Sequence, residues 1–334
     1  MSKSLQQQII GNAPALSLVQ KLADLGRNRH LSGSYILTGH DSVVTARAAA
    51  WLFQALACLS ADAYPCGLCA NCHSLSHGLF PDLYQLQIET DKKGIGIEQI
   101  KKLISQLSLS ALAGNYRFVL INNAETLSIS AANSLLKTLE EPGARIVIVL
   151  LVTDLGTLPA TIVSRSQLIQ FRQVSTNTLF DHLVKEVGLK RTLAKSIAHL
   201  SMGKFGLTES YLASETFYNE RISLADACLA ALTADLSARL SLTERLIKER
   251  SADSSNHANL LIVFQTLIRD LLLLNLDQPE LIHNDSLRAK LNDCKGRFSL
   301  KRLVDATKLI SQARLYLNAN VNPQLALENF LINL

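Results

Sequence analysis

Residues 117–153 read RFVLINNAETLSISAANSLLKTLEEPGARIVIVLLVT, and this stretch indicates the class of fold. Its two ends, Arg117–Asn122 and Ile146–Thr153, are apolar runs typical of buried strands, the second of them continuous and rich in β-branched residues. Between them, Ser130–Leu139 has a helical pattern and is stopped by the Pro-Gly pair that follows. Unbroken apolar strands that alternate with helices predict a parallel sheet covered by helices on both faces.

Further elements extend this pattern in both directions. Strands are predicted at Ser34–Leu37, Leu83–Ile88 and Leu168–Phe171, and helices at 12–28, 44–59 and 97–109. After about residue 174 the chain has no further convincing strand, and helical segments rich in Leu and Ala continue to Leu334. The sequence therefore predicts an α/β domain over residues 1–173, a small helical domain over 174–210 and a larger helical domain over 211–334.

Composition places limits on the class of protein. The chain has 334 residues, of which 48% are hydrophobic, and a formal net charge of +5, which is compatible with nucleic acid but does not demonstrate binding. Its N-terminus lacks the apolar core and cleavage site of a signal peptide. The most hydrophobic stretch, Leu260–Leu276, is interrupted by Arg269 and Asp270 and does not suit a membrane-spanning helix. We therefore expect a soluble, cytoplasmic protein with no membrane partner.

Four of the six cysteines gather in a short segment with the spacing C-x7-C-x2-C-x2-C, namely Cys58, Cys66, Cys69 and Cys72. Zinc binds four thiolates in a tetrahedron, and Pro65 and Gly67 supply tight turns between the ligands. The segment 58–72 therefore predicts a structural zinc module. Two alternatives stay open: incidental buried thiols, and replacement of one ligand by the nearby His73 or His77.

The strand Ser34–Leu37 leads into TGHDSVVTA, residues 38–46, where a G-x-x-x-x-G-K-[ST] phosphate loop would lie. Gly39 holds the first position of that pattern. Val44, Thr45 and Ala46 replace the second Gly, the Lys and the Ser/Thr, so close backbone approach, the phosphate-binding charge and a magnesium ligand are all lost. Asp41 adds a negative charge near the place of the phosphates. The loop therefore predicts a degenerate site that does not hydrolyse ATP.

The end of the next strand points the same way. An ATPase needs an acidic pair there to hold magnesium and orient water, whereas this strand ends in Asn122, Asn123, Ala124 and Glu125. Asn122 cannot carry the required charge. An α/β fold that never held a nucleotide is the alternative interpretation.

The run AANSLLKTLEEP, residues 131–142, resembles the signature of bacterial clamp-loader AAA+ subunits. Ile146–Thr153 and then LPATIVSRS, residues 158–166, resemble that family's sensor-1 strand and its Ser-Arg-Cys motif, with Ser166 in place of the Cys. The cysteine cluster also falls where the family has its zinc. The resemblance covers about residues 1–170, with the motifs in the same order.

The resemblance implies a P-loop-NTPase-like AAA+ domain, followed by an all-α lid and an all-α collar that joins subunits. The family contains the gamma and tau ATPases and a delta-prime type whose nucleotide site is degenerate, and this sequence has the delta-prime combination. Arg165 is then an arginine finger that acts in trans on a neighbouring gamma or tau subunit, and Ser164 holds its loop. Gly206 lies about where active members carry a nucleotide-contacting arginine. A surface ion pair is the alternative role for Arg165.

The implied partners are gamma/tau and delta subunits in a hetero-oligomeric ring, the sliding clamp, and primed DNA contacted through its phosphates. A group of lysines, Lys92, Lys93, Lys101 and Lys102, is interpreted mainly as solvated surface. The resemblance implies zinc but no ATP as cofactor, and no activity of the isolated chain, although the chain would be part of the DNA polymerase III holoenzyme. The alternatives are an active gamma/tau-type ATPase and a zinc-containing DNA-binding protein.

Overall fold

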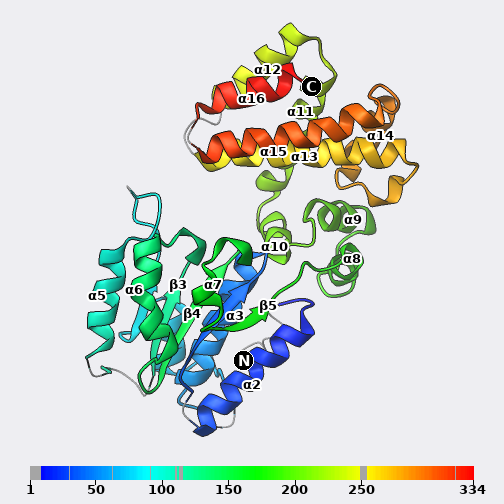
Figure 1. Ribbon diagram of the computed structural model, residues 1–334. Coiled ribbons are helices and arrows are strands. Elements are labelled where there is room, and N and C mark those ends of the chain that lie inside the picture. The colour runs from blue at the N-terminus through cyan, green and yellow to red at the C-terminus, as the bar shows by residue number, and fades with distance from the viewer. Residues whose placement is uncertain are drawn as a thin grey trace. The chain divides into compact units, whose positions relative to one another are not determined.

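The structure, a computed structural model, describes residues 9–29, 31–61, 63–90, 92–109, 111–112, 116–248, 254–319 and 321–334 (Figure 1). The chain divides into two compact units. The first runs to Thr178 and also contains Lys204–Gly206, and the second contains Leu179–Gly203 and Leu207–Leu334. Residues 179–203 are thus grouped with the C-terminal helices, and the separate domains 174–210 and 211–334 stay a prediction.

A five-stranded sheet lies at the centre of the first unit (Figure 1). Its order is β2-β3-β4-β1-β5, and every pairing between neighbours is parallel. The strands are β1 (Gly33–Thr38), β2 (Leu83–Leu86), β3 (Arg117–Ile121), β4 (Ile146–Val152) and β5 (Gln167–Gln170). The predicted fold class, a parallel α/β sheet covered by helices and followed by a helical region, is confirmed, and each predicted strand lies within two residues of the observed bounds.

The helical elements of the first unit are α2 (Ala13–Arg29), α3 (Ser42–Ala57), α4 (Ala70–Ser76), α5 (Ile97–Leu107), η1 (Ala124–Thr126), α6 (Ile129–Glu140), η2 (Leu155–Thr157) and α7 (Ala160–Val163). Side chains alternate across β4: Ile148 and Leu150 pack in one core cluster with α5 and α6. On the opposite face α3 packs against the sheet, and Phe53 stacks on Phe118 of β3 with ring centroids 4.6 Å apart. Both faces are therefore covered, as the unbroken apolar strands predicted.

Tyr116, just before β3, ties the sheet to the helix layer. Its buried hydroxyl donates a hydrogen bond to the carbonyl of Gly26 at 2.7 Å and accepts one from the backbone N–H of Leu31 at 2.8 Å. Burial raises the pKa of this hydroxyl, so it remains a donor at any physiological pH. These two bonds fix the connection between α2 and β1.

The second unit contains only helices among its described elements, and two of these helices begin with residues of the first unit, 176–178 and 205–206. Its elements are α8 (Thr176–Lys185), α9 (Arg191–Leu200), α10 (Phe205–Ala213), α11 (Glu215–Thr233), α12 (Leu236–Lys248), α13 (Ser254–Asn275), η3 (Pro279–Leu281), η4 (Asp285–Leu287), α14 (Arg288–Asp293), α15 (Leu300–Asn318) and α16 (Pro323–Ile332). One large apolar core joins α11, α13, α15 and α16, with Phe264 against Phe330 at its centre. In the described part of the chain, no helix is long and apolar enough to cross a membrane.

Asp270, one of the two charged residues that interrupt the apolar helix α13, forms hydrogen bonds inside this unit. Asp270 is fully buried and accepts hydrogen bonds from the backbone N–H groups of His283 and Asn284, each at 2.8 Å, and from the Asn284 side chain at 2.7 Å. Burial raises the pKa of Asp270, while burial and the nearby Arg269, His199 and Arg221 lower the pKa of His283 to about 4. The residues of η3 and η4 are thereby held against α13.

Replacing Tyr116 by Phe should lower the free energy of unfolding by about 1–3 kcal/mol, because the Leu31 N–H and the Gly26 carbonyl lose their buried partner. Urea unfolding followed by circular dichroism measures this. Tyr84→Phe is the matched control, since no hydrogen bond to the Tyr84 hydroxyl is found among the described residues. Equal losses in the two variants would contradict the prediction.

Stability should fall as the pH is lowered from about 6.5 towards 4. In that window the unfolded chain binds a proton at His283 and the folded chain does not, so acid favours unfolding. Thermal unfolding across this range should show a shallower slope for His283→Gln, whereas exposed His77→Gln should match the parent. Asp270 contributes the opposite trend in all three proteins, and the comparison therefore isolates His283.

Candidate functional site

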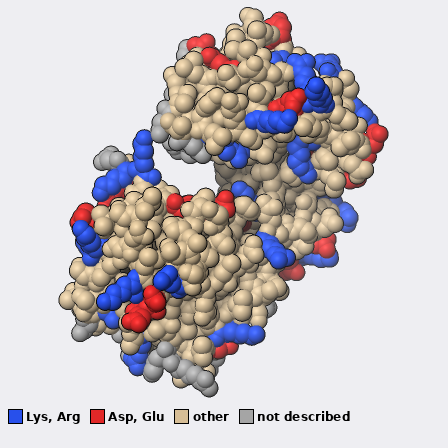
Figure 2. All heavy atoms as spheres, in the orientation of Figure 1, with Lys and Arg blue, Asp and Glu red and all other residues tan. Residues whose placement is uncertain are grey.

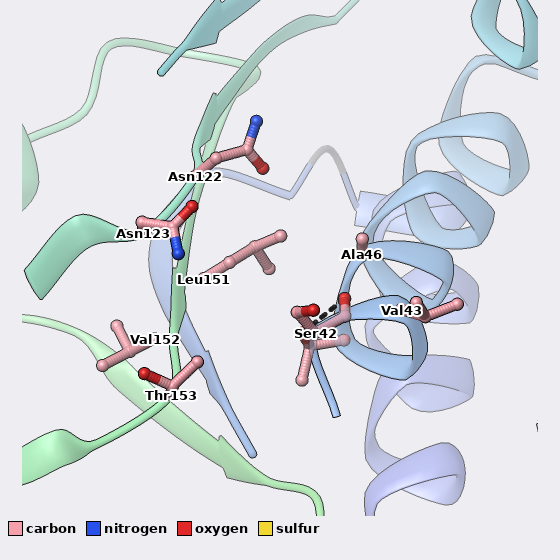
Figure 3. A pocket seen from close by; sticks show the side chains of 9 residues that line it. Ser42, Val43, Ala46, Asn122, Asn123, Leu151, Val152 and Thr153 are labelled. Atoms are coloured by element: carbon pink, nitrogen blue, oxygen red, sulfur yellow. Dashed lines mark hydrogen bonds between the residues drawn. The ribbon is translucent and has the colours of Figure 1, made fainter. Parts of the chain in front are cut away.

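A cavity of about 280 Å³ lies at the carboxyl ends of the central strands (Figure 3). The start of α3 forms one wall, and the ends of β3 and β4, with the residues that follow them, form the other. It is lined by Ser42, Val43, Thr45, Ala46, Asn122, Asn123, Leu151, Val152 and Thr153. This is where open parallel sheets bind ligands, and none of these nine side chains carries a charge.

Of the residues that the sequence analysis assigned to the phosphate loop, Thr45 and Ala46 are among the nine that line this cavity, whereas Gly39, Asp41 and Val44 are not. Gly39 donates its backbone N–H to the Val152 carbonyl at 3.1 Å, and a Cβ at this position would lie 2.9 Å from the carbonyl oxygen of Phe171. Thr45, at the position of the Lys, is buried and its hydroxyl donates to the Ser42 carbonyl at 3.1 Å. Gly39 therefore has a packing role of its own, and the Thr45 hydroxyl bonds to its own helix instead of reaching towards a ligand.

The opposite wall carries neutral amides and one internal carboxylate. Asn122 and Asn123 lie at the end of β3 beside the cavity, and Asn123 adopts the left-handed conformation, with φ 50°. The carboxylate of Glu125 accepts a hydrogen bond from the Thr153 hydroxyl at 2.5 Å and from the Thr153 N–H at 3.3 Å. Its other oxygen, Oε2, is buried with no partner among the described residues. Sequence reasoning noted Glu125 only as part of the altered acidic pair and missed its link to β4.

Asp41 has contacts that the sequence did not reveal. It is the N-cap residue of α3: its Oδ1 accepts from the backbone N–H of Val44 at 3.4 Å, and its Oδ2 accepts from the backbone N–H of Gly206 at 2.8 Å. A Cβ at Gly206 would lie 2.6 Å from the Cβ of Val43. The position that resembles the family's nucleotide-contacting arginine therefore has no room for a side chain.

The four predicted ligand cysteines come together in space. Their sulfur atoms lie within 4.8 Å of one another, and the Sγ atoms of Cys66 and Cys72 are 4.0 Å apart. Thiolates in a tetrahedron about 2.3 Å from zinc are roughly 3.8 Å from each other, so the cluster has the right size for one such ion. The donor set of four sulfurs suits a closed, structural site.

Backbone N–H groups stabilise the thiolate form of Cys66, which is the form that binds a metal. The Sγ of Cys66 accepts from the N–H of Leu68 at 3.5 Å and of Cys69 at 3.3 Å, and these bonds lower the pKa of Cys66 to about 6. The turn depends on Gly67, whose φ is 70°. Burial instead raises the pKa of Cys72, a thiol that a bound cation would deprotonate.

The side chain of Arg27, in α2, links the cysteine module to α2 and α3. Arg27 donates to the carbonyls of Ala55 at 3.1 Å and Cys58 at 3.0 Å, and its guanidinium lies 4.3 Å from the ring centroid of Tyr64. The Tyr64 hydroxyl donates in turn to Asp24 at 2.9 Å. The segment before Cys66 is thereby fixed at both ends.

The two histidines near the cluster take no part in it. Among the described residues the group of possible metal ligands consists of the four cysteines, while His73 and His77 lie with their ring centroids 4.4 Å apart on the exposed side of α4. The alternative in which a histidine replaces a cysteine ligand has no support in this geometry.

Arg165 lies between α7 and β5 and pairs with α6. Its Nε is 3.1 Å from Oε2 of Glu140, and its Nη1 donates to the Thr161 carbonyl at 3.1 Å. The Ser164 hydroxyl donates to the same carbonyl at 3.2 Å, so it stabilises the turn that carries Arg165. Both ionised side chains are partly exposed, at 33% for Arg165 and 60% for Glu140, and such pairs are worth about 0–1 kcal/mol.

The lysines near α5 are divided between ion pairs and solvent. Lys92 pairs with Glu89 at 2.6 Å and Lys101 with Glu98 at 3.0 Å. Figure 2 shows basic side chains spread over the visible face with acidic ones among them. These contacts suit the interpretation as solvated surface.

Comparison with known proteins places these features in a family. The chain is 33% identical over 156 residues to DNA polymerase III subunit delta' of Bacillus subtilis, which is 47% of this chain and 47% of that protein. It is 32% identical over 158 residues to subunit tau of Salmonella typhimurium, which is 47% of this chain and 24% of that protein. The matches thus span about half or less of these relatives. A gamma subunit-related protein of Thermotoga maritima superposes with a TM-score of 0.48 at 18% identity, covering 94% of this chain and 97% of that one.

Two family models match long parts of the chain. The model described as DNA polymerase III, delta subunit, matches residues 15–175, and the model for the C-terminal part of that subunit matches residues 216–334. Together they take in most of the chain, including the cysteine cluster, the cavity and Arg165. The chain therefore belongs to the DNA polymerase III clamp-loader family that includes the delta', tau and gamma subunits.

Proposed function

We propose that this chain is a non-hydrolysing subunit of the delta-prime type in a DNA polymerase III clamp loader. In this role it stands in a hetero-oligomeric ring with gamma/tau and delta subunits and helps to place the sliding clamp on primed DNA. The observation that carries the proposal is a cavity at the expected nucleotide position that has no charged lining residue. The same chain keeps Arg165 in the motif Ser164-Arg165-Ser166.

A magnesium–triphosphate complex needs charge that this cavity does not offer. Phosphates are held by a lysine and by backbone N–H groups, and the metal is held by a hydroxyl and an acidic residue. Thr45, Ala46 and Asn122 stand at those positions, and the nearby carboxylate of Glu125 is engaged by Thr153. These substitutions favour a subunit that neither binds nor hydrolyses ATP over an active ATPase of the gamma/tau type.

Arg165 is the residue with which this chain would act on a neighbour. An arginine finger stabilises negative charge that builds on the γ-phosphate in another subunit. The ion pair with Glu140 keeps the guanidinium in place while the neighbouring subunit holds no nucleotide. Because this pair is solvent-exposed, it is weak enough for Arg165 to exchange Glu140 for a phosphate. The Ser164 hydroxyl supports the turn.

Zinc is the metal that best suits the four sulfurs. Thiolate ligands select soft or borderline ions, and a closed set of four leaves no open position for chemistry. Cys58, Cys66, Cys69 and Cys72 would hold the ion, which would tie α3 to α4 and close the loop between them. Its role is to stabilise the fold of this segment.

Arg165→Ala should lower the ATPase turnover of a reconstituted clamp loader measured with clamp and primed DNA. An arginine finger raises the hydrolysis rate roughly 10³–10⁵-fold at the site it serves. Its loss should therefore remove almost all of the turnover that this one site contributes to the total. Exposed Arg172→Ala is the matched control and should leave turnover unchanged. Glu140→Gln removes the resting ion pair and should change turnover far less than Arg165→Ala.

Two results would contradict this role. Hydrolysis of ATP by the isolated wild-type chain would favour the gamma/tau-type ATPase. Equal turnover with wild type and Arg165→Ala would leave the chain as a ring subunit without a finger.

The purified chain should contain about one zinc ion, measured by plasma mass spectrometry, and should lose thermal stability when a strong chelator removes it. Cys66→Ser should lower the zinc content and the melting temperature together. His77→Ala should keep both, since that side chain lies outside the sulfur cluster. Full zinc content in Cys66→Ser, or its loss in His77→Ala, would contradict this ligand set.

A further inference from the structure

The carboxylate of Asp41 lies between the first turns of two helices. One oxygen accepts from the N–H of Val44 in α3 at 3.4 Å, and the other accepts from the N–H of Gly206 at the start of α10 at 2.8 Å. The first turn of a helix exposes N–H groups without intrahelical partners and carries partial positive charge. The single carboxylate of Asp41 therefore accepts hydrogen bonds from the first turns of both α3 and α10.

A nucleotide-binding loop uses the same kind of donors for phosphate. Its backbone N–H groups, at the start of the helix that follows the first strand, surround the anion. Here Asp41, a residue of the loop itself, already caps that helix with its own negative charge. A phosphate that approached α3 would have to displace a carboxylate and would be repelled by it.

The segment around Gly206 is shaped for this contact. A Cβ at Gly206 would come within 2.6 Å of the Cβ of Val43 and 2.9 Å of Oδ1 of Asp41. The neighbouring Phe205 is buried, at 5% exposure, and the guanidinium of Arg47 in α3 lies 5.9 Å from its ring centroid. Residues 204–206 thus pack closely on the first turns of α3, as members of the first compact unit.

We propose that Asp41 is a built-in substitute for a nucleotide phosphate, which caps α3, holds residues 204–206 against the loop and excludes phosphate from the cavity beside it. This inference rests on the proposed non-hydrolysing role and names the residue that enforces it. Loss of the lysine weakens affinity for a nucleotide, whereas Asp41 occupies the N–H of Val44, a donor in the first turn of α3 that a phosphate would need.

Hydrogen exchange of the full-length chain tests the contact. Asp41→Ala should speed amide exchange at Val44 and Gly206 by roughly tenfold, the scale of a lost N-cap. Asp41→Asn, which keeps one acceptor oxygen, should fall between Asp41→Ala and wild type and serves if Asp41→Ala does not fold. Exposed His40→Ala is the matched control and should behave as wild type. Unchanged exchange at Gly206 in the Asp41 variants would overturn the proposal.

Magnesium tripolyphosphate tests the exclusion of phosphate. In thermal unfolding it should leave wild type and His40→Ala unchanged and raise the melting temperature of Asp41→Ala or Asp41→Asn. Faster exchange without any shift by tripolyphosphate would overturn the role as a phosphate substitute. Stabilisation of wild type itself by ATP would instead contradict the proposal that the chain does not bind ATP, and the ATPase comparison with Arg165→Ala tests the proposed function independently of Asp41.

Discussion

Strand β4 is buried along its whole length, and the geometry of the first unit depends on it. It pairs with β3 on one side and β1 on the other, and its alternating side chains hold helices on both faces. Its carboxyl end also fixes the candidate site, since the Val152 carbonyl accepts from Gly39 and Thr153 bonds to Glu125. A shift of this strand by one residue would move the loop after β1 and the end of β3 out of register with each other.

The cavity at this edge lies at the carboxyl ends of the strands, and the carboxylates near it bond to other groups of the protein. Asp41 caps α3 and bonds to Gly206, and Glu125 is engaged by Thr153. The lining itself is neutral. A carboxylate that is partly withdrawn from water needs hydrogen-bond donors, and here backbone and hydroxyl donors of the protein supply them. These two carboxylates thus stabilise the fold.

Arg165 and the cysteine module are two further features of the first unit, and they lie in different segments of the chain. Arg165 stands on a short turn after α7, where a weak ion pair with Glu140 and the carbonyl of Thr161 orient it. The cysteine module depends on local turns, above all at Gly67, and on Arg27, which fixes it to the carbonyl of Cys58. The Arg165–Glu140 pair is partly exposed to solvent, whereas the sulfur atoms of the cysteine module lie together within 4.8 Å of one another.

Local pattern alone determined the strands, the helices between them and the set of four cysteines, because burial on both faces leaves an unbroken apolar run, helices leave a 3.6-residue period, and a shared metal needs closely spaced ligands. It also predicts a degenerate phosphate loop at Val44, Thr45 and Ala46. The helix α4 inside the cysteine segment was missed, since it is too short to show a period. Only the tertiary structure decided the contact of Asp41 with Gly206, 165 residues away, and those of Glu125 with Thr153 and Arg165 with Glu140. A side chain's partner across the fold depends on which elements meet, and no local period records that choice.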